Sequence, residues 1–241
     1  MPEQRGHRGS RTHLRLDRRA GRLYNGEADP GLSDFMETDS FLLNAARPVG
    51  SDGEAILLRM NNSHAEMAAW AFGFLHPAPD AAALDVGCGG GANLATLLEM
   101  CPQGSATGVD YSEVSVGLSS RLNAEAIEQG RCRVMQGDVC CLPFEDDHFD
   151  VATAFETLYF WPDPIGGLRE LRRVLRPGGT LLVCHEADGS RPGDDLWPQR
   201  IPGMRVYSAE QLAELLTAAG FAAVETHKGP RAGWVCALGL A

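Results

Sequence analysis

Three acidic residues close to a glycine-rich loop are the first candidates for chemistry in this 241-residue chain. Asp85 lies in the apolar run ALDVG, Asp110 ends the run SATGVD, and Asp138 ends the run RVMQGD. The loop Gly87–Gly91 follows the first run, and glycines are needed where the backbone turns sharply and approaches a ligand. The helix after such a loop offers free N–H groups. This arrangement indicates a ligand with a cationic amino-acid end, a ribose diol and an adenine, but no phosphate.

The same loop also fits a second kind of nucleotide site. Gly87-x-Gly89-x-x-Ala92, with Asp110 about twenty residues later, satisfies the dinucleotide fingerprint G-x-G-x-x-A. A dinucleotide site has less use for a carboxylate at Asp85 or at Asp138. An NAD-dependent dehydrogenase therefore stays open as an alternative that these two acids disfavour.

The elements that must position these residues alternate between strands and helices. Helical stretches lie at 92–100, 112–129, 164–175 and 208–219, and apolar runs of strand length lie at 82–87, 105–110, 133–138, 149–155, 179–186, 222–227 and 234–240. This alternation predicts a mostly parallel sheet with helices on both faces. Only HKGPRAG joins the last two runs, too short for a crossover helix, so the seventh strand is expected to pair antiparallel with the sixth. The predicted fold class is α/β, a doubly wound, Rossmann-like sheet of seven strands.

A further helix is predicted ahead of the sheet, at about 63–75. Ser63 followed by Glu66 has the spacing of a capping box, and Met67, Trp70 and Phe74 recur at helical intervals. His64 would open this helix. We divide the chain into a basic, flexible extension (1–50) and a domain (51–241), with a helical cap at about 51–77 and a Gly- and Pro-rich lid at 187–207.

Composition limits the classes of partner and location. The net charge of −11 disfavours nucleic acid as a general partner, although seven arginines in residues 1–22 could touch RNA or an anionic lipid. No apolar run of about 18 residues occurs, so we expect no membrane span and a cytoplasmic protein. The seven cysteines lack zinc-binding spacing and are expected to be reduced. The oligomeric state is left open.

Five segments in order carry a resemblance to a known family. LDVGCGGG, GVDYS, GDVCCLPFEDDHFD, AFETLYFWPD and RVLRPGG resemble the motifs of class I S-adenosylmethionine-dependent methyltransferases, most closely the small bacterial enzymes of the type 11 group. The resemblance covers about residues 56–240. It implies S-adenosylmethionine as cofactor and a small molecule as methyl acceptor, since no large extra domain is present to grip a protein or nucleic acid.

The resemblance also implies roles for individual residues. Asp85 with Gly87, Cys88 and Gly89 would hold the methionine part, and Asp110 would accept the ribose hydroxyls. The remaining implied cofactor contacts lie along the adenine and at the end of the fourth strand, at Tyr111, Asp138, Val139 and Phe155. Asp110 could instead cap the following helix, and Asp138 could merely order a turn.

The aromatic run FETLYFWPD is expected to leave the sheet where the transferable methyl group would point. Tyr159 and His64 are the catalytic candidates, and Trp161 and His185 are the candidates for substrate contact. Core packing is the alternative for both Tyr159 and Trp161, and His185 could be an ordinary strand-end residue hydrogen-bonded to a neighbour. AFET lacks the Asn-Pro-Pro-Tyr pattern of adenine and glutamine methylation. No Asp and Asn cluster of the magnesium-dependent type is present, so no metal is expected. A catalytically silent cofactor-binding module remains a second alternative.

Overall fold

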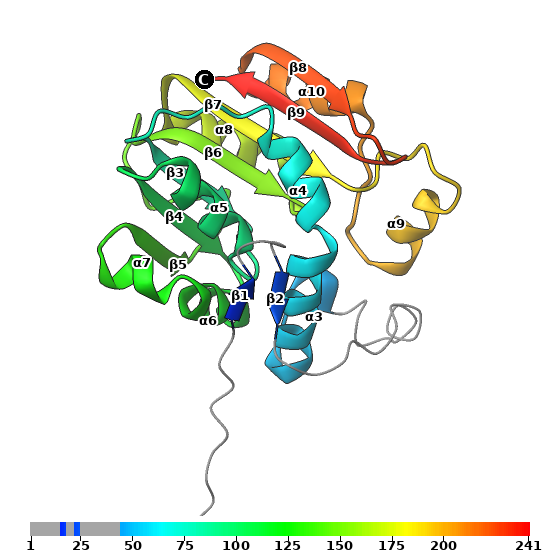
Figure 1. Ribbon diagram of the computed structural model, residues 1–241. Coiled ribbons are helices and arrows are strands. Elements are labelled where there is room, and N and C mark those ends of the chain that lie inside the picture. Colours follow the sequence, from blue (N-terminus) through cyan, green and yellow to red (C-terminus); the bar gives the residue numbers. More distant parts are fainter. Residues whose placement is uncertain (1–14, 18–21, 25–43) are drawn as a thin grey trace, which may run out of the picture.

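The computed structural model describes residues 15–17, 22–24 and 44–241. Within this part, a seven-stranded sheet has the order β5-β4-β3-β6-β7-β9-β8 (Figure 1). Its strands are β3 (Ala82–Val86), β4 (Ser105–Asp110), β5 (Cys132–Gln136), β6 (Phe149–Phe155), β7 (Leu175–His185), β8 (Ala222–Lys228) and β9 (Val235–Leu240). Neighbours from β5 to β7 pair in parallel, whereas β9 runs antiparallel to both β7 and β8. The predicted α/β fold and its antiparallel final hairpin are confirmed.

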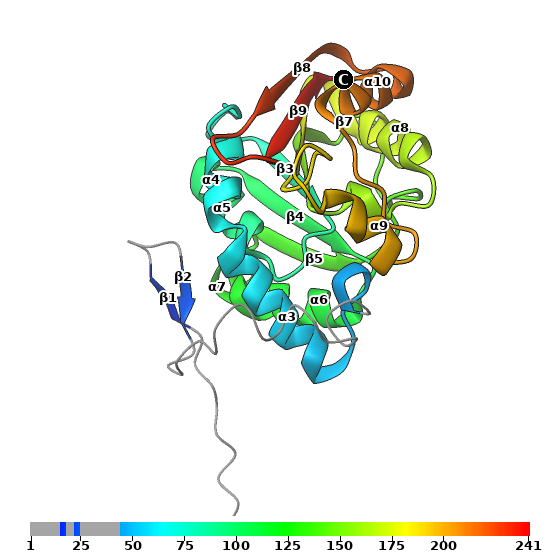
Figure 2. The same ribbon diagram turned by 90° about the vertical axis from the view of Figure 1, so that its right-hand side faces the viewer.

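Helices cover both faces of this sheet. The described residues form α3 (Gly50–Ser63), α4 (Ala65–Phe72), α5 (Ala92–Met100), α6 (Glu113–Leu122), α7 (Ala124–Glu128), α8 (Pro164–Val174), α9 (Trp197–Arg200) and α10 (Ala209–Ala219). Of these, α4 to α8 and α10 pack on strands of the sheet, whereas α3 packs on α6. Figure 2 shows α4 and α5 on one side and α8 and α10 on the other, with the sheet between them. The resulting three layers are those of a doubly wound domain.

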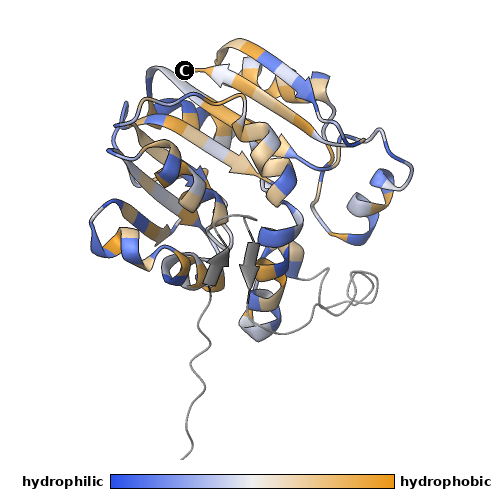
Figure 3. Ribbon diagram, in the orientation of Figure 1, coloured by the Kyte–Doolittle hydropathy of each residue, from blue (hydrophilic) through white to orange (hydrophobic). Residues whose placement is uncertain are grey.

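Alternate residues of the strands contribute their side chains to two apolar clusters, one on each face of the sheet. Leu84 and Val86 belong to the cluster beneath α8 and α10, whereas Ala83 belongs to the cluster beneath α4 and α5. Because successive strand residues point to opposite faces, a strand buried on both sides must be apolar throughout. Figure 3 shows this concentration of hydrophobic residues along the central strands. Asp85 interrupts the pattern in β3, and its side chain is buried.

The helix predicted at about 63–75 has a different start. α3 runs from Gly50 to Ser63, His64 is the junction residue, and α4 begins at Ala65. The Ser63 hydroxyl donates to the carbonyl of Met60, and no side chain caps α4. The prediction of a capping box is therefore wrong, because Ser63 is the last residue of a preceding helix and an N-cap must be non-helical.

The basic extension lies mostly outside the described residues. Of the arginine-rich segment 1–22, the structure describes β1 (Arg15–Asp17) and part of β2 (Arg22–Tyr24), which pair antiparallel. The predictions for residues 1–14, 18–21 and 25–43 fall on the part that is not described. Among the helices that are described, none combines the length and the apolarity needed to cross a membrane.

Candidate functional site

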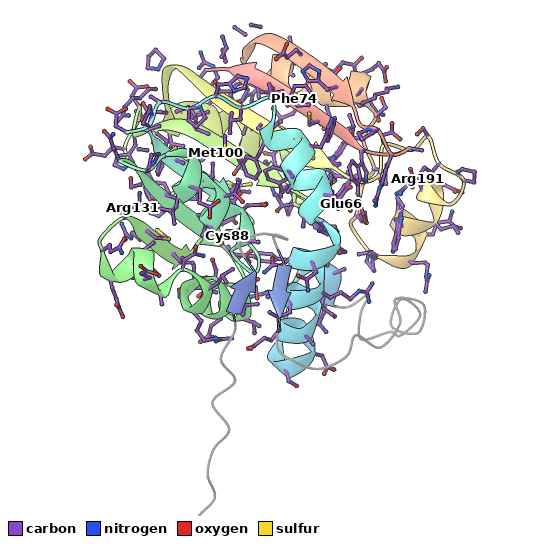
Figure 4. All side chains as sticks on the ribbon, viewed as in Figure 1. Glu66, Phe74, Cys88, Met100, Arg131 and Arg191 are labelled. Atoms are coloured by element: carbon purple, nitrogen blue, oxygen red, sulfur yellow. The ribbon has the colours of Figure 1, made fainter. Side chains whose placement is uncertain are left out.

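A cavity of about 770 Å³ opens at the carboxyl ends of the parallel strands. Its walls come from the loop after β3, the ends of β4, β6 and β7, the α3–α4 pair, and the segment between β7 and α10. The sheet order reverses between β3 and β6, and open α/β sheets bind ligands at such a switch point. Figure 4 marks three lining residues, Glu66 in α4, Cys88 in the loop after β3 and Arg191 on the segment leading to α9. The volume lies in the upper part of the range of about 300–1,000 Å³ typical of small-molecule sites.

In the glycine loop, backbone atoms form the cavity wall directly, because the glycines carry no side chain that would cover them. Gly87 and Gly89 have φ angles of 66° and 51°, in the left-handed region that favours glycine. A Cβ atom on Gly87 would lie 2.2 Å from the Oγ1 atom of Thr157, whereas a Cβ atom on Gly89 would meet its nearest atom at 3.5 Å. Gly87 is thus required by close packing as well as by its backbone conformation.

Asp110 ends β4 with its carboxylate tied to this loop. Oδ2 accepts the N–H of Gly89 at 2.9 Å, and Oδ1 accepts the N–H of Ser112 at 2.8 Å. Burial raises the pKa of this carboxyl, and the backbone hydrogen bonds act in the opposite direction. Each carboxylate oxygen can accept more than one hydrogen bond, and Asp110 lines the cavity. The side chain can therefore still accept the two hydroxyls of a ribose.

Asp85 presents a buried oxygen that lacks a partner. Its Oδ1 accepts the hydroxyl of Thr153 at 2.6 Å, whereas Oδ2 has no hydrogen-bond partner within the described residues. Burial raises its pKa to about 7, against the lowering effect of Thr153 and with a smaller raising effect of Asp110. Asp85 itself does not line the cavity. An unsatisfied carboxylate behind the glycine loop suits a cationic group of a ligand, reached directly or through water.

Three further predicted cofactor residues line the cavity. Cys88 is buried beside the loop, and the aromatic ring of Phe155 lies 4.9 Å from that of Phe72. Tyr111 follows Asp110 and is 41% exposed, and its hydroxyl donates to the carbonyl of Ala46. This wall therefore offers an aromatic face beside a carboxylate, as the predicted ribose and adenine contacts require.

Besides Asp85, four predicted site residues do not line the cavity. Asp138 is exposed and accepts the N–H of Cys140 at 2.9 Å, so it orders a turn, and Val139 packs against the core. The Trp161 indole is buried in the α8 core and donates to Thr157 Oγ1 at 3.2 Å. The ring of His185 is fully buried against that of Tyr159 at 4.1 Å, and burial lowers its pKa to about 3.

The two catalytic candidates meet on one side of the cavity. The Tyr159 hydroxyl donates to Oε1 of Glu156 at 3.2 Å and accepts the N–H of Ala187 at 3.1 Å. Nε2 of His64 lies 3.8 Å from Oε1 of Glu186. Burial lowers the pKa of His64, Glu186 opposes this shift, and Arg59 adds to it. His64 and Tyr159 are thus connected through two glutamates.

Sequence reasoning missed those glutamates. Glu156 directly follows β6 and Glu186 directly follows β7, the same strand-end position by which Asp110 was found. One ligand atom each from His64, Glu156 and Glu186 lie within 4.8 Å of one another. Such a group of potential metal ligands runs against the expectation that no metal binds.

The segment predicted as a lid supplies an apolar wall opposite these acids. Trp197, Ile201 and Met204 line the cavity, and the latter two pack with Tyr159. The cavity therefore combines a polar corner with an apolar pocket, which suits an uncharged or aromatic small molecule.

Comparisons with known proteins identify the central segment. Residues 84–183 match a family model described as a methyltransferase domain. An O-methyltransferase of Pyrenophora dematioidea is 32% identical over 158 residues, which are 63% of this chain and 58% of that protein. The chain spans between 30% and 58% of the length of that protein and three other curated relatives.

Solved structures extend the similarity to most of the chain. A SAM-dependent methyltransferase from Aquifex aeolicus matches with a TM-score of 0.61 at 18% identity, covering 78% of this chain and 97% of the other, a likeness in fold. The [4+2]-cyclase SpnF matches with a TM-score of 0.57 at 31% identity, covering 67% of this chain and 59% of the other.

Proposed function

We propose that this protein transfers a methyl group from S-adenosylmethionine to a nucleophilic atom of a small molecule, because residues 84–183 match the model of a methyltransferase domain of the type 11 group. The observation that carries the proposal is the glycine loop tied to Asp110 at the wall of a large cavity at the switch point of the sheet. The free state of all seven cysteines agrees with the cytoplasm as the proposed location.

The cofactor set consists of residues that surround the glycine loop. Asp110 would accept the ribose hydroxyls, Tyr111 would lie along the adenine or ribose, and Asp85 would face the ammonium group from behind the loop. Gly87, Cys88, Gly89 and Phe155 complete this set. Asp138 and Val139 are left out of it, because the exposed carboxylate of Asp138 accepts a hydrogen bond within a turn and Val139 packs against the core, whereas Asp85 keeps a buried oxygen without a partner among the described residues. When bound, S-adenosylmethionine supplies a methyl group on a sulfonium cation.

The acceptor would occupy the part of the cavity between the glutamates and the lid segment. Ile201, Met204 and Trp197 would exclude water and hold an apolar body, while His64, Glu156 and Glu186 would face its nucleophilic atom. Methyl transfer to such an atom depends mainly on alignment and exclusion of water. The net charge of −11 and the size of the cavity, about 770 Å³, favour a small acceptor over nucleic acid.

Calorimetric titration of the full chain with S-adenosylhomocysteine and with NAD tests the cofactor. We expect one site for S-adenosylhomocysteine and no heat with NAD. NAD binding without S-adenosylhomocysteine binding would replace the proposal by a dehydrogenase. A panel of hydroxylated and aminated aromatic acceptors, assayed with methyl-labelled donor, then tests the transfer.

The likeness to SpnF supports one second candidate, cyclisation of a bound substrate without methyl transfer. Cofactor binding is common to both candidates. Incorporation of label into a product supports methyl transfer, whereas an isomerised product of unchanged mass supports cyclisation.

A further inference from the structure

Two carboxylates at neighbouring strand ends form a negative corner of the cavity. β6 and β7 pair in parallel, so Glu156 and Glu186 emerge side by side, and the N–H of Glu186 donates to Oε1 of Glu156 at 2.6 Å. Arg191 also lines the cavity, and it is paired with Asp194 at 3.0 Å. A further cation in this corner would relieve the repulsion between the two carboxylates.

The imidazole of His64 completes a set of three donors from three elements. Its separation of 3.8 Å from Glu186 is too long for a hydrogen bond. Two ligand atoms separated by this distance can each lie about 2.0–2.2 Å from one common ion. The ligand atoms of His64, Glu156 and Glu186 all lie within 4.8 Å of one another.

The surroundings of Glu156 resemble the outer contacts of a metal ligand. Its Oε1 is fixed by the Tyr159 hydroxyl and by the Glu186 N–H. Hydrogen bonds of this kind orient a ligating carboxylate and leave the other oxygen available. All three donors line the cavity, so an ion there would keep positions open toward the acceptor.

We propose that His64, Glu156 and Glu186 bind a divalent metal ion that holds the acceptor's hydroxyl group. This role rests on the proposed function, whereas the binding of the ion does not. Coordination would lower the pKa of the hydroxyl, whose proton leaves to water. The oxygen then forms a bond to the methyl carbon, the carbon–sulfur bond breaks, and its electron pair goes to sulfur.

Mn²⁺ titration of the full chain, followed by loss of the free-ion electron paramagnetic resonance signal, tests the site. Mn²⁺ suits carboxylate ligands and avoids capture by the free cysteines. We expect one ion per chain and at least about tenfold weaker binding in Glu156→Gln, Glu186→Gln and His64→Ala. Glu225→Gln is the matched control, because Glu225 lies 3.6 Å from His227 but has no third donor among the residues that the structure describes, and it lies outside the cavity.

The outcomes separate the site from the enzyme activity. Absence of Mn²⁺ binding, or equal binding by the wild type and all three cluster variants, overturns the proposal. Affinity for S-adenosylhomocysteine, measured on the same variants, shows that each is folded. Mn²⁺ binding without S-adenosylhomocysteine binding would support the metal site and contradict the proposed function.

Discussion

The backbone N–H of Glu186 and the hydroxyl of Tyr159 both donate to one oxygen of Glu156, at 2.6 and 3.2 Å. Tyr159 is buried, and its hydroxyl also accepts the N–H of Ala187. A phenol with these partners is better placed to orient Glu156 than to receive a proton from a substrate. Tyr159 is therefore a positioning residue within the proposed site.

Tyr159→Phe should slow methyl transfer by about 10- to 100-fold, as expected when an outer contact of a functional carboxylate is lost. Affinity for S-adenosylhomocysteine should stay unchanged, since Tyr159 lies apart from the glycine loop. Single-turnover transfer to an acceptor from the panel provides the measurement. Tyr207→Phe is the control, because the Tyr207 hydroxyl has no hydrogen-bond partner in the described part of the chain. Equal rates of methyl transfer in the wild type and Tyr159→Phe would show that Tyr159 does not act by orienting Glu156.

Asp110→Ala should weaken binding of S-adenosylhomocysteine by roughly 10- to 150-fold, because hydrogen bonds to a charged group contribute about 1.5–3 kcal/mol. The matched change Asp138→Ala removes a carboxylate from the next strand end but outside the cavity, and should leave the affinity near that of the wild type. Calorimetric titration of both variants with S-adenosylhomocysteine measures the two affinities. A large loss of affinity for S-adenosylhomocysteine in Asp138→Ala, without one in Asp110→Ala, would place the adenine at the end of β5.

Gly87→Ala and Gly89→Ala make the same chemical change at two positive φ angles. Gly89→Ala should destabilise the fold by about 1–2 kcal/mol, the cost of a left-handed conformation for alanine. Gly87→Ala should cost about 1–3 kcal/mol more, because its Cβ atom overlaps Thr157. Urea unfolding measures both values. A smaller loss for Gly87→Ala would show that the loop can shift away from Thr157.

His185 should make the fold sensitive to acid. Burial lowers its pKa from 6.5 to about 3, so protons bind the unfolded chain more readily than the native one. The contribution of the neutral His185 to the free energy of unfolding is fully present above about pH 6.5 and is lost as the pH falls toward 3. The free energy of unfolding that His185 contributes falls by about 2 kcal/mol between pH 7.5 and pH 5.

His185→Phe keeps an aromatic ring against Tyr159 and should abolish that contribution. Urea unfolding of both proteins at pH 7.5 and 5 gives the comparison. An equal loss of stability on acidification in both proteins would mean that His185 gains a partner, such as internal water, that the ring contacts do not reveal.

Much of the fold and part of the site follow from local signals in the sequence. Helix α5 and strands β4 and β6 have the predicted bounds, because apolar runs between glycines, acids and charged turns mark such elements locally. The glycine loop and Asp110 are recognisable for the same reason, since the loop directly follows β3, Asp110 ends the next strand, and the two are joined by a hydrogen bond within one β-loop-α-β unit. The start of α4 was missed because α3 lacks strong periodicity and ends directly beside it.

Only the tertiary structure decided which strand-end residues share the cavity. Asp110 and Asp138 look alike in sequence, but β4 lies beside β3 and its loop, whereas β5 is the edge strand. His185 and Glu186 are adjacent, yet the first is buried behind Tyr159 and the second faces the cavity. Side chains change faces with each strand residue, so a shift of one position exchanges core and site. The meeting of His64 with Glu156 and Glu186 likewise depends on how the α3–α4 junction packs over the sheet, which no local pattern specifies.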